Sequence, residues 1–391
     1  MSDLLNGRWQ ETKEALLEGL SGIRRSSMSV TLENTRKYLA ESASAGATSA
    51  GNVATLNRVI LPVIRRVMPT VIANELVGVQ PMTGPVGQIH TLRVRYSDTS
   101  ANAGVLAGEE ALSPFKIAAS YSGNETAATP RAGSTATLEG AAGKRMSIQI
   151  LKQVVEAKTR KLSARWTFEA AQDAQAQQGI DIEAEIMAAL AQEITAEIDQ
   201  EILGSLRSLA GTAVETYDQS AVSGVATFVG DEHAALAVQI NRAANLIAQR
   251  TRRGAGNYAV VSPMALTILQ SATTSAFART TEGTFEAPTN TKFVGTLNSA
   301  MRVYVDSYAN DSTGVLIGYK GSSESDAPAF YCPYIPLMSS GVVLDPSTFE
   351  PVVSFMTRYG YVELTNTASS LGNAADYLAN VAITSTAVKF S

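Results

Sequence analysis

The sequence predicts an α+β fold, and three observations carry that prediction. Residues 181–209 have the pattern of one long amphipathic helix, with apolar side chains at four-residue spacing. Two short alternating strands, at 91–96 and 146–150, enclose a long stretch of small residues. Residues 232–261 have a helix, a basic turn and a buried strand in that order, which is typical of a layered α/β body.

The composition excludes several classes of protein. The chain has 391 residues, enough for one large elaborated domain or for two to three hydrophobic cores. Its net charge is −5, so strong binding to nucleic acid by charge alone is not expected. Charged residues make up only 17%, which indicates that much surface is buried between subunits. No apolar run is long enough to span a membrane, and no secretory signal is visible. We therefore expect the protein to be made and kept in a reducing cytoplasm.

Cysteine and histidine are too scarce for most metal or catalytic sites. Cys332 is the single cysteine, which excludes an internal disulfide and a cysteine zinc site. His90 and His233 are the two histidines. The run Gly140–Arg145 resembles a phosphate loop but lacks its leading glycine and the Ser or Thr after Lys144. We therefore expect no catalytic site, no cofactor and no bound metal.

The first half of the chain alternates short patterned elements with stretches of small residues. Residues 1–41 have two short helical patterns, and 42–52 form an Ala/Ser/Gly linker. Apolar and polar residues alternate at 91–96 and again at 146–150, so each is a strand with one apolar face. The residues between them, 97–145, have too few large apolar side chains to form their own core. We expect a long two-stranded tongue.

Two helices follow the tongue. The first covers 167–178 and is ended by Gly179, and Asp181 caps the second, which covers 181–209. The second helix is rich in Asp and Glu, but a di-iron site needs Glu-x-x-His pairs and this helix has no histidine. Its acids are therefore interpreted as a solvated or intersubunit face.

The second half predicts a mixture of helices and short strands. Helices are expected at 232–250 and 264–270, on either side of a buried strand at 259–261. Three arginines near the end of the first of these helices are candidate intersubunit contacts. An equal alternative is that they lie at a solvated helix end, where the macrodipole favours cations, and contact with DNA is less favoured. They are Arg250, Arg252 and Arg253. Further strands are expected at 301–305, 315–319, 329–333, 342–344, 357–362 and 382–390.

Five blocks of this sequence, in the same order, resemble the major capsid proteins of T-even-like tailed bacteriophages (myoviruses), which have the Hong Kong 97 capsid fold. The first block is ELVGVQPMTGPVGQIHTLRVRY, at residues 75–96. The others lie at residues 154–185, 251–263, 317–337 and 345–360. The resemblance implies six regions: a scaffold-like segment, expected to be cleaved, at 1–41; an N-terminal arm at 42–88; an extended loop (the tongue) at 89–165; a peripheral domain with its spine helix at 166–209; an axial domain at 210–335; and a return to the peripheral domain at 336–391.

The resemblance also implies a function. The chain is expected to be a non-enzymatic structural protein of the virion that forms homo-oligomers, as hexameric capsomers, and closes them into an icosahedral head around DNA. Its expected partners are other copies of itself, a vertex protein, a scaffold and a maturation protease in the prohead, and decoration proteins, with weak or no direct DNA binding and no membrane. Assembly is expected in the host cytoplasm. The alternatives are a pentameric vertex paralogue, an encapsulin-like container and, in another class, a soluble carboxylate enzyme, which requires a pocket with perturbed acids.

A maturation cleavage site is expected between Glu41 and Ser42. The family's protease resembles one that cuts after Glu when Leu or Ile stands two residues earlier. Of the 24 glutamates, only Glu18 and Glu41 meet that condition. The Ala/Ser/Gly linker that begins at Ser42 favours protease access. Covalent links between chains through Lys116 or Lys144, known in some proteins of this fold, are not expected.

Overall fold

In the computed structural model, the helices and strands are distributed over two units of the chain. Unit 1 consists of Met1–Gly87, Val155–Ser205 and Ala329–Val362, and unit 2 consists of Gln88–Val154, Leu206–Pro328 and Glu363–Ser391. The structure describes residues 9–10, 13–14, 17, 22, 25–34, 71–100, 104–109, 111, 121–123, 132–140, 142–178, 181–218, 229–251, 253–272, 277–279, 292–298, 300–310, 313–324, 326–348, 350–364 and 374–384.

Unit 1 is organised around a five-stranded sheet. Its strands are β1 (Gly78–Val79), β4 (Lys158–Arg165), β11 (Ala329–Ser339), β12 (Val343–Leu344) and β13 (Pro351–Glu363). β4 pairs antiparallel with β13 over eight residues, and β1 pairs parallel with β11. β11 contains two prolines, Pro333 and Pro336. Pro333 fits within the strand because its carbonyl still accepts a hydrogen bond, from the Met82 amide at 3.0 Å.

The long helix predicted from the apolar periodicity is present as α7 (Ile182–Ala210), preceded by α6 (Phe168–Gln178). Asp181 caps α7 as expected, since its Oδ1 accepts a hydrogen bond from the Glu183 amide at 3.1 Å. Gly211, at φ 63°, follows its last residue in the left-handed conformation that commonly ends helices. The predicted apolar stripe is buried at Ile194, Ile198, Ile202 and Leu206. A short helix, α4 (Ala73–Leu76), precedes β1.

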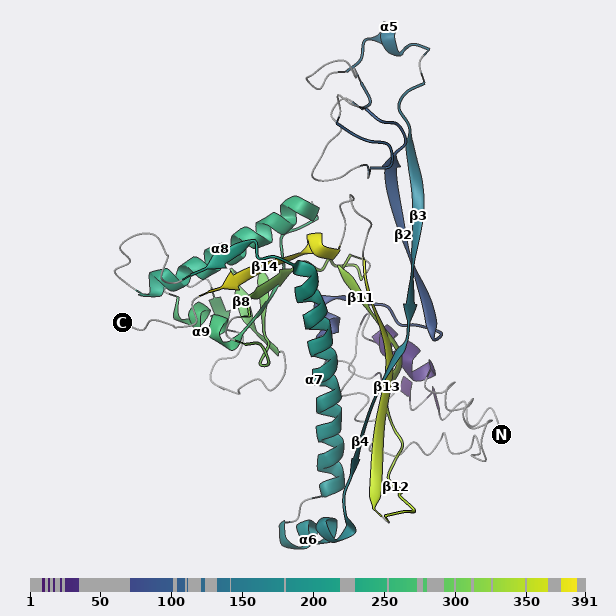
Figure 1. The fold of residues 1–391 in the computed structure, drawn as a ribbon, viewed down its shortest axis with the longest axis vertical. Helices are drawn as coiled ribbons and strands as arrows, with labels where there is room; N and C mark the ends of the chain where they lie inside the picture. Colours follow the sequence, from purple (N-terminus) through teal and green to yellow (C-terminus); the bar gives the residue numbers. More distant parts are fainter. Residues whose placement is uncertain are drawn as a thin grey trace. The chain divides into compact units, whose positions relative to one another are not determined.

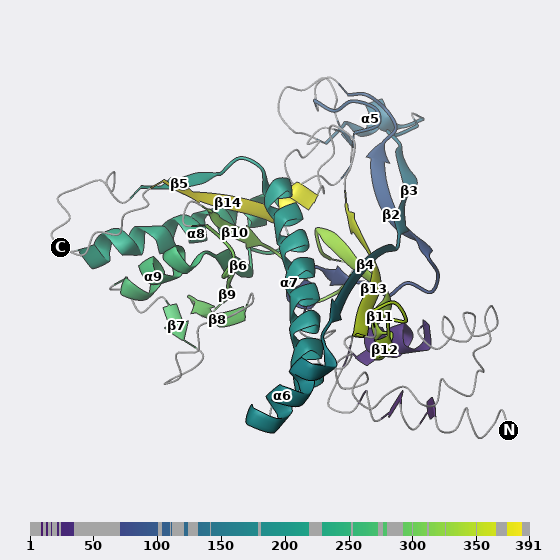
Figure 2. The ribbon, with the colours of Figure 1, turned by 60° about the horizontal axis from the view of Figure 1, so that its bottom comes forward.

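The body of unit 2 is a seven-stranded sheet with helices packed on it. In spatial order the strands are β5 (Glu215–Tyr217), β14 (Leu378–Ile383), β10 (Val315–Gly318), β6 (Tyr258–Val261), β9 (Met301–Val305), β8 (Lys292–Leu297) and β7 (Phe277–Arg279). Two helices, α8 (Val229–Thr251) and α9 (Pro263–Ser271), pack against one another and against this sheet (Figures 1 and 2). Ser262 caps α9, and a one-turn 3-10 helix, η4 (Ala374–Tyr377), precedes β14. The core between helices and sheet is apolar and includes Leu236, Ile240 and Ile247 of α8.

The tongue predicted from alternation is present as a separate two-stranded sheet. It consists of β2 (Val86–Tyr96) and β3 (Met146–Glu156), which run side by side in Figure 1. Both strands are longer than the alternating cores that predicted them. The helix α5 (Thr135–Leu138) lies in the excursion between them.

The C-terminal strand was expected at 382–390, in a return to the peripheral domain. The strand that the structure describes here is β14, which pairs with β10 and β5 in the sheet of unit 2, and residues 385–391 lie outside the described residues. The strands β1, β4, β5, β7 and β8 were not predicted from the sequence. Within the described part of the chain, no helix is both long and apolar enough to cross a bilayer.

Candidate assembly surfaces

The first candidate surface is one face of β3. Side chains two residues apart on a strand point to the same side. Four apolar residues at such spacing are each more than half exposed: Met146, Ile148, Ile150 and Val154, at 52%, 68%, 66% and 53%. We call these four residues the β3 stripe. A row of large apolar side chains in water is typical of a surface that another protein covers.

The excursion between β2 and β3 has a small core of its own beside Tyr96, which was not expected from the sequence. The rings of Tyr96 and Tyr121 lie with their centroids 4.6 Å apart, and Val105 packs with them. The Tyr121 hydroxyl donates a hydrogen bond of 2.6 Å to the Arg145 carbonyl, and the Arg145 amide donates one of 2.8 Å to Asp98. Two tyrosines separated by 24 residues therefore order the base of an excursion that is otherwise poor in large side chains.

A cluster of charged and hydroxyl groups joins α7 to β4 and β13 in unit 1. The Arg160 Nε atom donates to the Tyr359 hydroxyl at 2.6 Å, and its terminal nitrogens pair with Glu197 at 2.6 Å and Glu201 at 2.5 Å. The Tyr359 hydroxyl in turn donates to Glu201. Burial favours the neutral carboxyl, but the hydrogen bonds from Arg160 and Tyr359 outweigh it and hold the pKa of Glu201 below its usual value. The cluster fixes the helix against the sheet.

The structure describes two of the three candidate arginines, and these two have different surroundings. Arg253 makes an ion pair with Asp326, which also accepts a hydrogen bond of 3.4 Å from the Tyr377 hydroxyl. Its charge is therefore neutralised within unit 2. Arg250 lies half-buried in the last turn of α8, where the helix dipole favours a cation. Arg252 lies outside the described residues, as do Glu41 and Ser42 of the expected cleavage site.

The N-terminal segment contacts the rest of unit 1 through Asn34. Residues 25–34 are helical, and Met28 and Leu32 on this helix are almost fully buried. The Asn34 side-chain amide donates to two backbone carbonyls, Met82 at 2.6 Å and Tyr334 at 3.0 Å. These two bonds tie the segment to chain positions 48 and 300 residues away.

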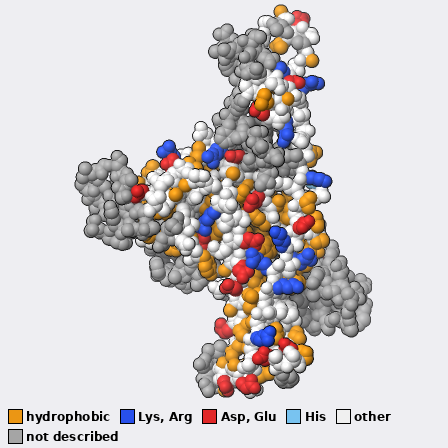
Figure 3. Space-filling view, viewed as in Figure 1, with side chains coloured by type: hydrophobic (Ala, Val, Ile, Leu, Met, Phe, Trp, Pro, Cys, Tyr) orange, Lys and Arg blue, Asp and Glu red, His pale blue; other side chains and the backbone are white. Residues whose placement is uncertain are grey.

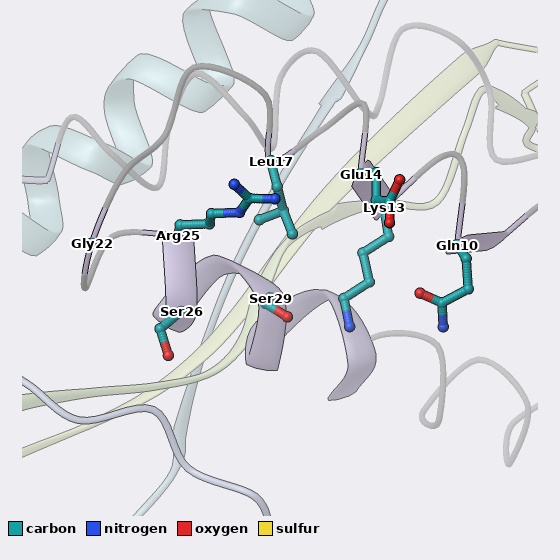
Figure 4. A pocket seen from close by; sticks show the side chains of 8 residues that line it. All are labelled: Gln10, Lys13, Glu14, Leu17, Gly22, Arg25, Ser26 and Ser29. Carbon is teal, nitrogen blue, oxygen red and sulfur yellow. The ribbon is translucent and has the colours of Figure 1, made fainter.

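One pocket lies within this N-terminal segment (Figure 4). Its lining residues are Gln10, Lys13, Glu14, Leu17, Gly22, Arg25, Ser26 and Ser29. The carboxylate-enzyme alternative requires a general acid, and a carboxyl group serves as a general acid best when its pKa is raised. The acids in the described residues whose pKa values are shifted, namely Asp98, Glu201 and Asp345, have lowered values, and all lie outside this pocket. Among the described residues, no cluster of three His, Cys, Asp or Glu side chains could hold a metal ion.

Comparisons with known proteins cover most of the chain. The family model described as major capsid protein Gp23 matches residues 53–141 and 118–388. The major capsid protein of Vibrio phage KVP40 is 31% identical, over 85% of this chain and 82% of the relative. The major capsid protein of Enterobacteria phage T4 is also 31% identical, over 83% and 78%. Among solved structures, a chain from the capsid of Myoviridae phage XM1 has 11% identity and a TM-score of 0.43, covering 80% of this chain and 92% of its own length.

Proposed function

We propose, from the premise that this chain belongs to the Gp23 family of major capsid proteins, that its copies form hexameric capsomers of an icosahedral phage head. Membership makes the chain a structural subunit of the phage capsid, in a family that is not known for enzymes.

The single observation that best supports assembly through the tongue is the β3 stripe. Ile148 and Ile150 are about two-thirds exposed, although each would gain roughly 1.5–3 kcal/mol from full burial. In the proposed capsomer, the stripe of each subunit is covered by the next subunit. A ring or shell repeats this contact many times, so a modest gain per contact becomes a large gain per particle.

The proposal is tested by changing the stripe without changing the subunit. The variant Ile148→Asp/Ile150→Asp should remain folded by circular dichroism but fail to form particles in sedimentation velocity and electron microscopy, because it places charges in the contact. The matched control is Ser147→Asp/Gln149→Asp, on the opposite, also exposed, face of β3. Particles of normal size from the isoleucine variant would contradict the proposal.

The finer assignments also belong to this proposal. The hexamer role is proposed over the pentameric vertex role, with a separate vertex protein, a scaffold, a maturation protease and decoration proteins as partners, and with assembly in the host cytoplasm. Proteolysis is proposed after Glu41, so that the chain in infectious virions begins at Ser42. Intact-mass measurement on virions tests this, and a full-length chain, or any other first residue, would contradict it.

A further inference from the structure

The pocket in the N-terminal segment has a polar lining that the family assignment does not explain. Four of its lining residues are helical and have the i, i+3, i+4 and i+7 spacing of one helix face: Gln10, Lys13, Glu14 and Leu17. Three more come from the helix at 25–34: Arg25, Ser26 and Ser29. The cavity has a volume of about 430 Å³. This volume lies within the range of about 300–1,000 Å³ that is typical of ligand pockets.

The two helical stretches that form the pocket are joined through Glu33. Its carboxylate accepts a hydrogen bond of 3.3 Å from the Trp9 indole and one of 3.4 Å from the Lys13 ammonium group. Leu17 on the first stretch and Met28 on the second are both buried. The charge of Lys13 is therefore neutralised within the segment, and the walls of the pocket are held in place before any ligand enters.

Arg25 is a cation of the pocket that has no partner. Within the described residues neither Arg25 nor Glu14 forms an ion pair, and both are exposed. Figure 4 shows the Arg25 side chain extended toward Leu17. In the region of α7, by contrast, basic and acidic side chains are intermixed (Figure 3), and Arg160 there is paired with two glutamates. The guanidinium of Arg25 is therefore available to a ligand from outside the chain.

The other polar groups of the pocket favour a carboxylate as that ligand. A carboxylate accepts two parallel hydrogen bonds from one guanidinium, and further ones from hydroxyl and amide groups. Glu14 repels a continuous row of negative charges such as the phosphates of DNA, and the net charge of −5 acts in the same direction. A short acidic peptide segment therefore fits better than nucleic acid. Five lining side chains can donate hydrogen bonds to it: Gln10, Lys13, Arg25, Ser26 and Ser29.

We propose that this pocket binds an acidic peptide segment of a partner protein, with a carboxylate of the segment paired to Arg25 and hydrogen-bonded to the Ser29 hydroxyl. The role of this contact rests on the proposed function, because every lining residue precedes the proposed cut after Glu41. Proteolysis separates the pocket from the rest of the subunit, and the binding site is lost when the cut segment dissociates. The partner is therefore one that the subunit holds only before maturation.

The test measures peptide binding by the full-length chain. Trp9 precedes the first lining residue, and Trp166→Phe leaves Trp9 as the only tryptophan. A capped tetraglutamate peptide should change the Trp9 fluorescence with saturation at low salt, and a capped tetraglutamine peptide should not. Arg25→Glu should weaken tetraglutamate binding about fivefold or more, whereas Glu14→Gln should strengthen it about twofold. The matched control is Lys161→Glu, an exposed cation outside the pocket, which should leave the affinity unchanged.

The inference is overturned if tetraglutamate does not bind, if tetraglutamine binds equally well, or if Arg25→Glu binds like wild type. A short DNA duplex that displaces tetraglutamate at equal charge concentration would also overturn it, by showing a site for any polyanion. Thermal melting checks that the variants are folded, and Arg25→Gln replaces Arg25→Glu if the latter melts early. If Ile148→Asp/Ile150→Asp blocks particle formation but tetraglutamate does not bind, the proposed function stands and the inference fails. If that variant assembles normally, the proposed function itself fails.

Discussion

The substitution Ile194→Asp tests whether α7 is held by its buried stripe. Ile194 is 1% exposed, so the variant gives up about 1.5–3 kcal/mol of apolar burial. It also buries a polar group without a partner, at a further cost of about 1–3 kcal/mol. The combined loss of roughly 3–6 kcal/mol is a large part of the 5–15 kcal/mol that stabilises a typical domain. We therefore expect a protein that unfolds at much lower urea concentration, or that accumulates unfolded.

The pH dependence of the same variant gives a second readout. Burial disfavours the charged carboxylate, so the new carboxyl should have a raised pKa in the folded state. A raised pKa means that the folded state holds the proton more tightly than the unfolded state. The stability lost by the variant therefore grows as the pH rises above the unfolded-state pKa of about 3.9. Urea unfolding followed by helical circular dichroism at pH 5 and pH 8 measures this.

The control is Gln192→Asp, an exposed position on the same helix, where a loss of no more than about 0.5 kcal/mol is expected. An Ile194→Asp protein with the unfolding midpoint of the control at both pH values would refute the reasoning.

Three other outcomes are expected. Arg160→Met should lower stability by about 1–3 kcal/mol, because Glu201 loses a charged partner. The variant should also be less sensitive to acid than wild type. The lowered pKa of Glu201 adds stability at pH values above its unfolded-state pKa near 4.5, and this stability is lost as the pH falls through the folded-state pKa. Melting between pH 3 and 7 measures this, with Arg165→Met as control; equal acid curves for Arg160→Met and wild type would contradict it. Replacing residues 103–143 by a tight turn should leave circular dichroism and melting nearly unchanged but impair shell closure, since the core of the seven-stranded unit contains none of them; an aggregated product would show the opposite. Burial raises the pKa of Cys332 to about 12, so its thiol should react with a disulfide reagent only after unfolding, and rapid reaction of the native protein at pH 8 would contradict its burial.

Elements specified by local signals were predicted closely from the sequence. The cap at Asp181, the four-residue apolar spacing and Gly211 set both ends of α7 within its own stretch of chain. β9 was predicted with its observed bounds, Met301–Val305, because apolar residues dominate it. The exposed β3 stripe was recognisable as an alternating strand, but its exposure was not, since alternation does not say which face is covered.

Features that depend on distant partners were missed. β4 contains Lys158 and Lys161, a residue type depleted in strands, and it forms because β13 lies beside it, nearly two hundred residues later in the chain. The ion pair of Arg253 depends on Asp326, which no local pattern connects to it. The C-terminal strand was expected at 382–390, whereas β14 covers Leu378–Ile383, where it pairs with β10 and β5.

Asn34 holds the N-terminal segment to the rest of unit 1 by two hydrogen bonds, so cleavage of the chain and release of the cleaved peptide are two separate steps. The proposed cut after Glu41 lies seven residues beyond Asn34 and breaks a peptide bond, but it breaks neither bond to Met82 and Tyr334. The severed peptide therefore stays as a bound ligand whose residence time is set by its own off-rate. When the peptide dissociates, the carbonyls of Met82 and Tyr334 lose their hydrogen-bond donor. The surface that Met28 and Leu32 cover is then exposed to water or to another binding partner. Maturation of such a subunit therefore has two independent rates, the rate of proteolysis and the rate at which the cleaved peptide dissociates.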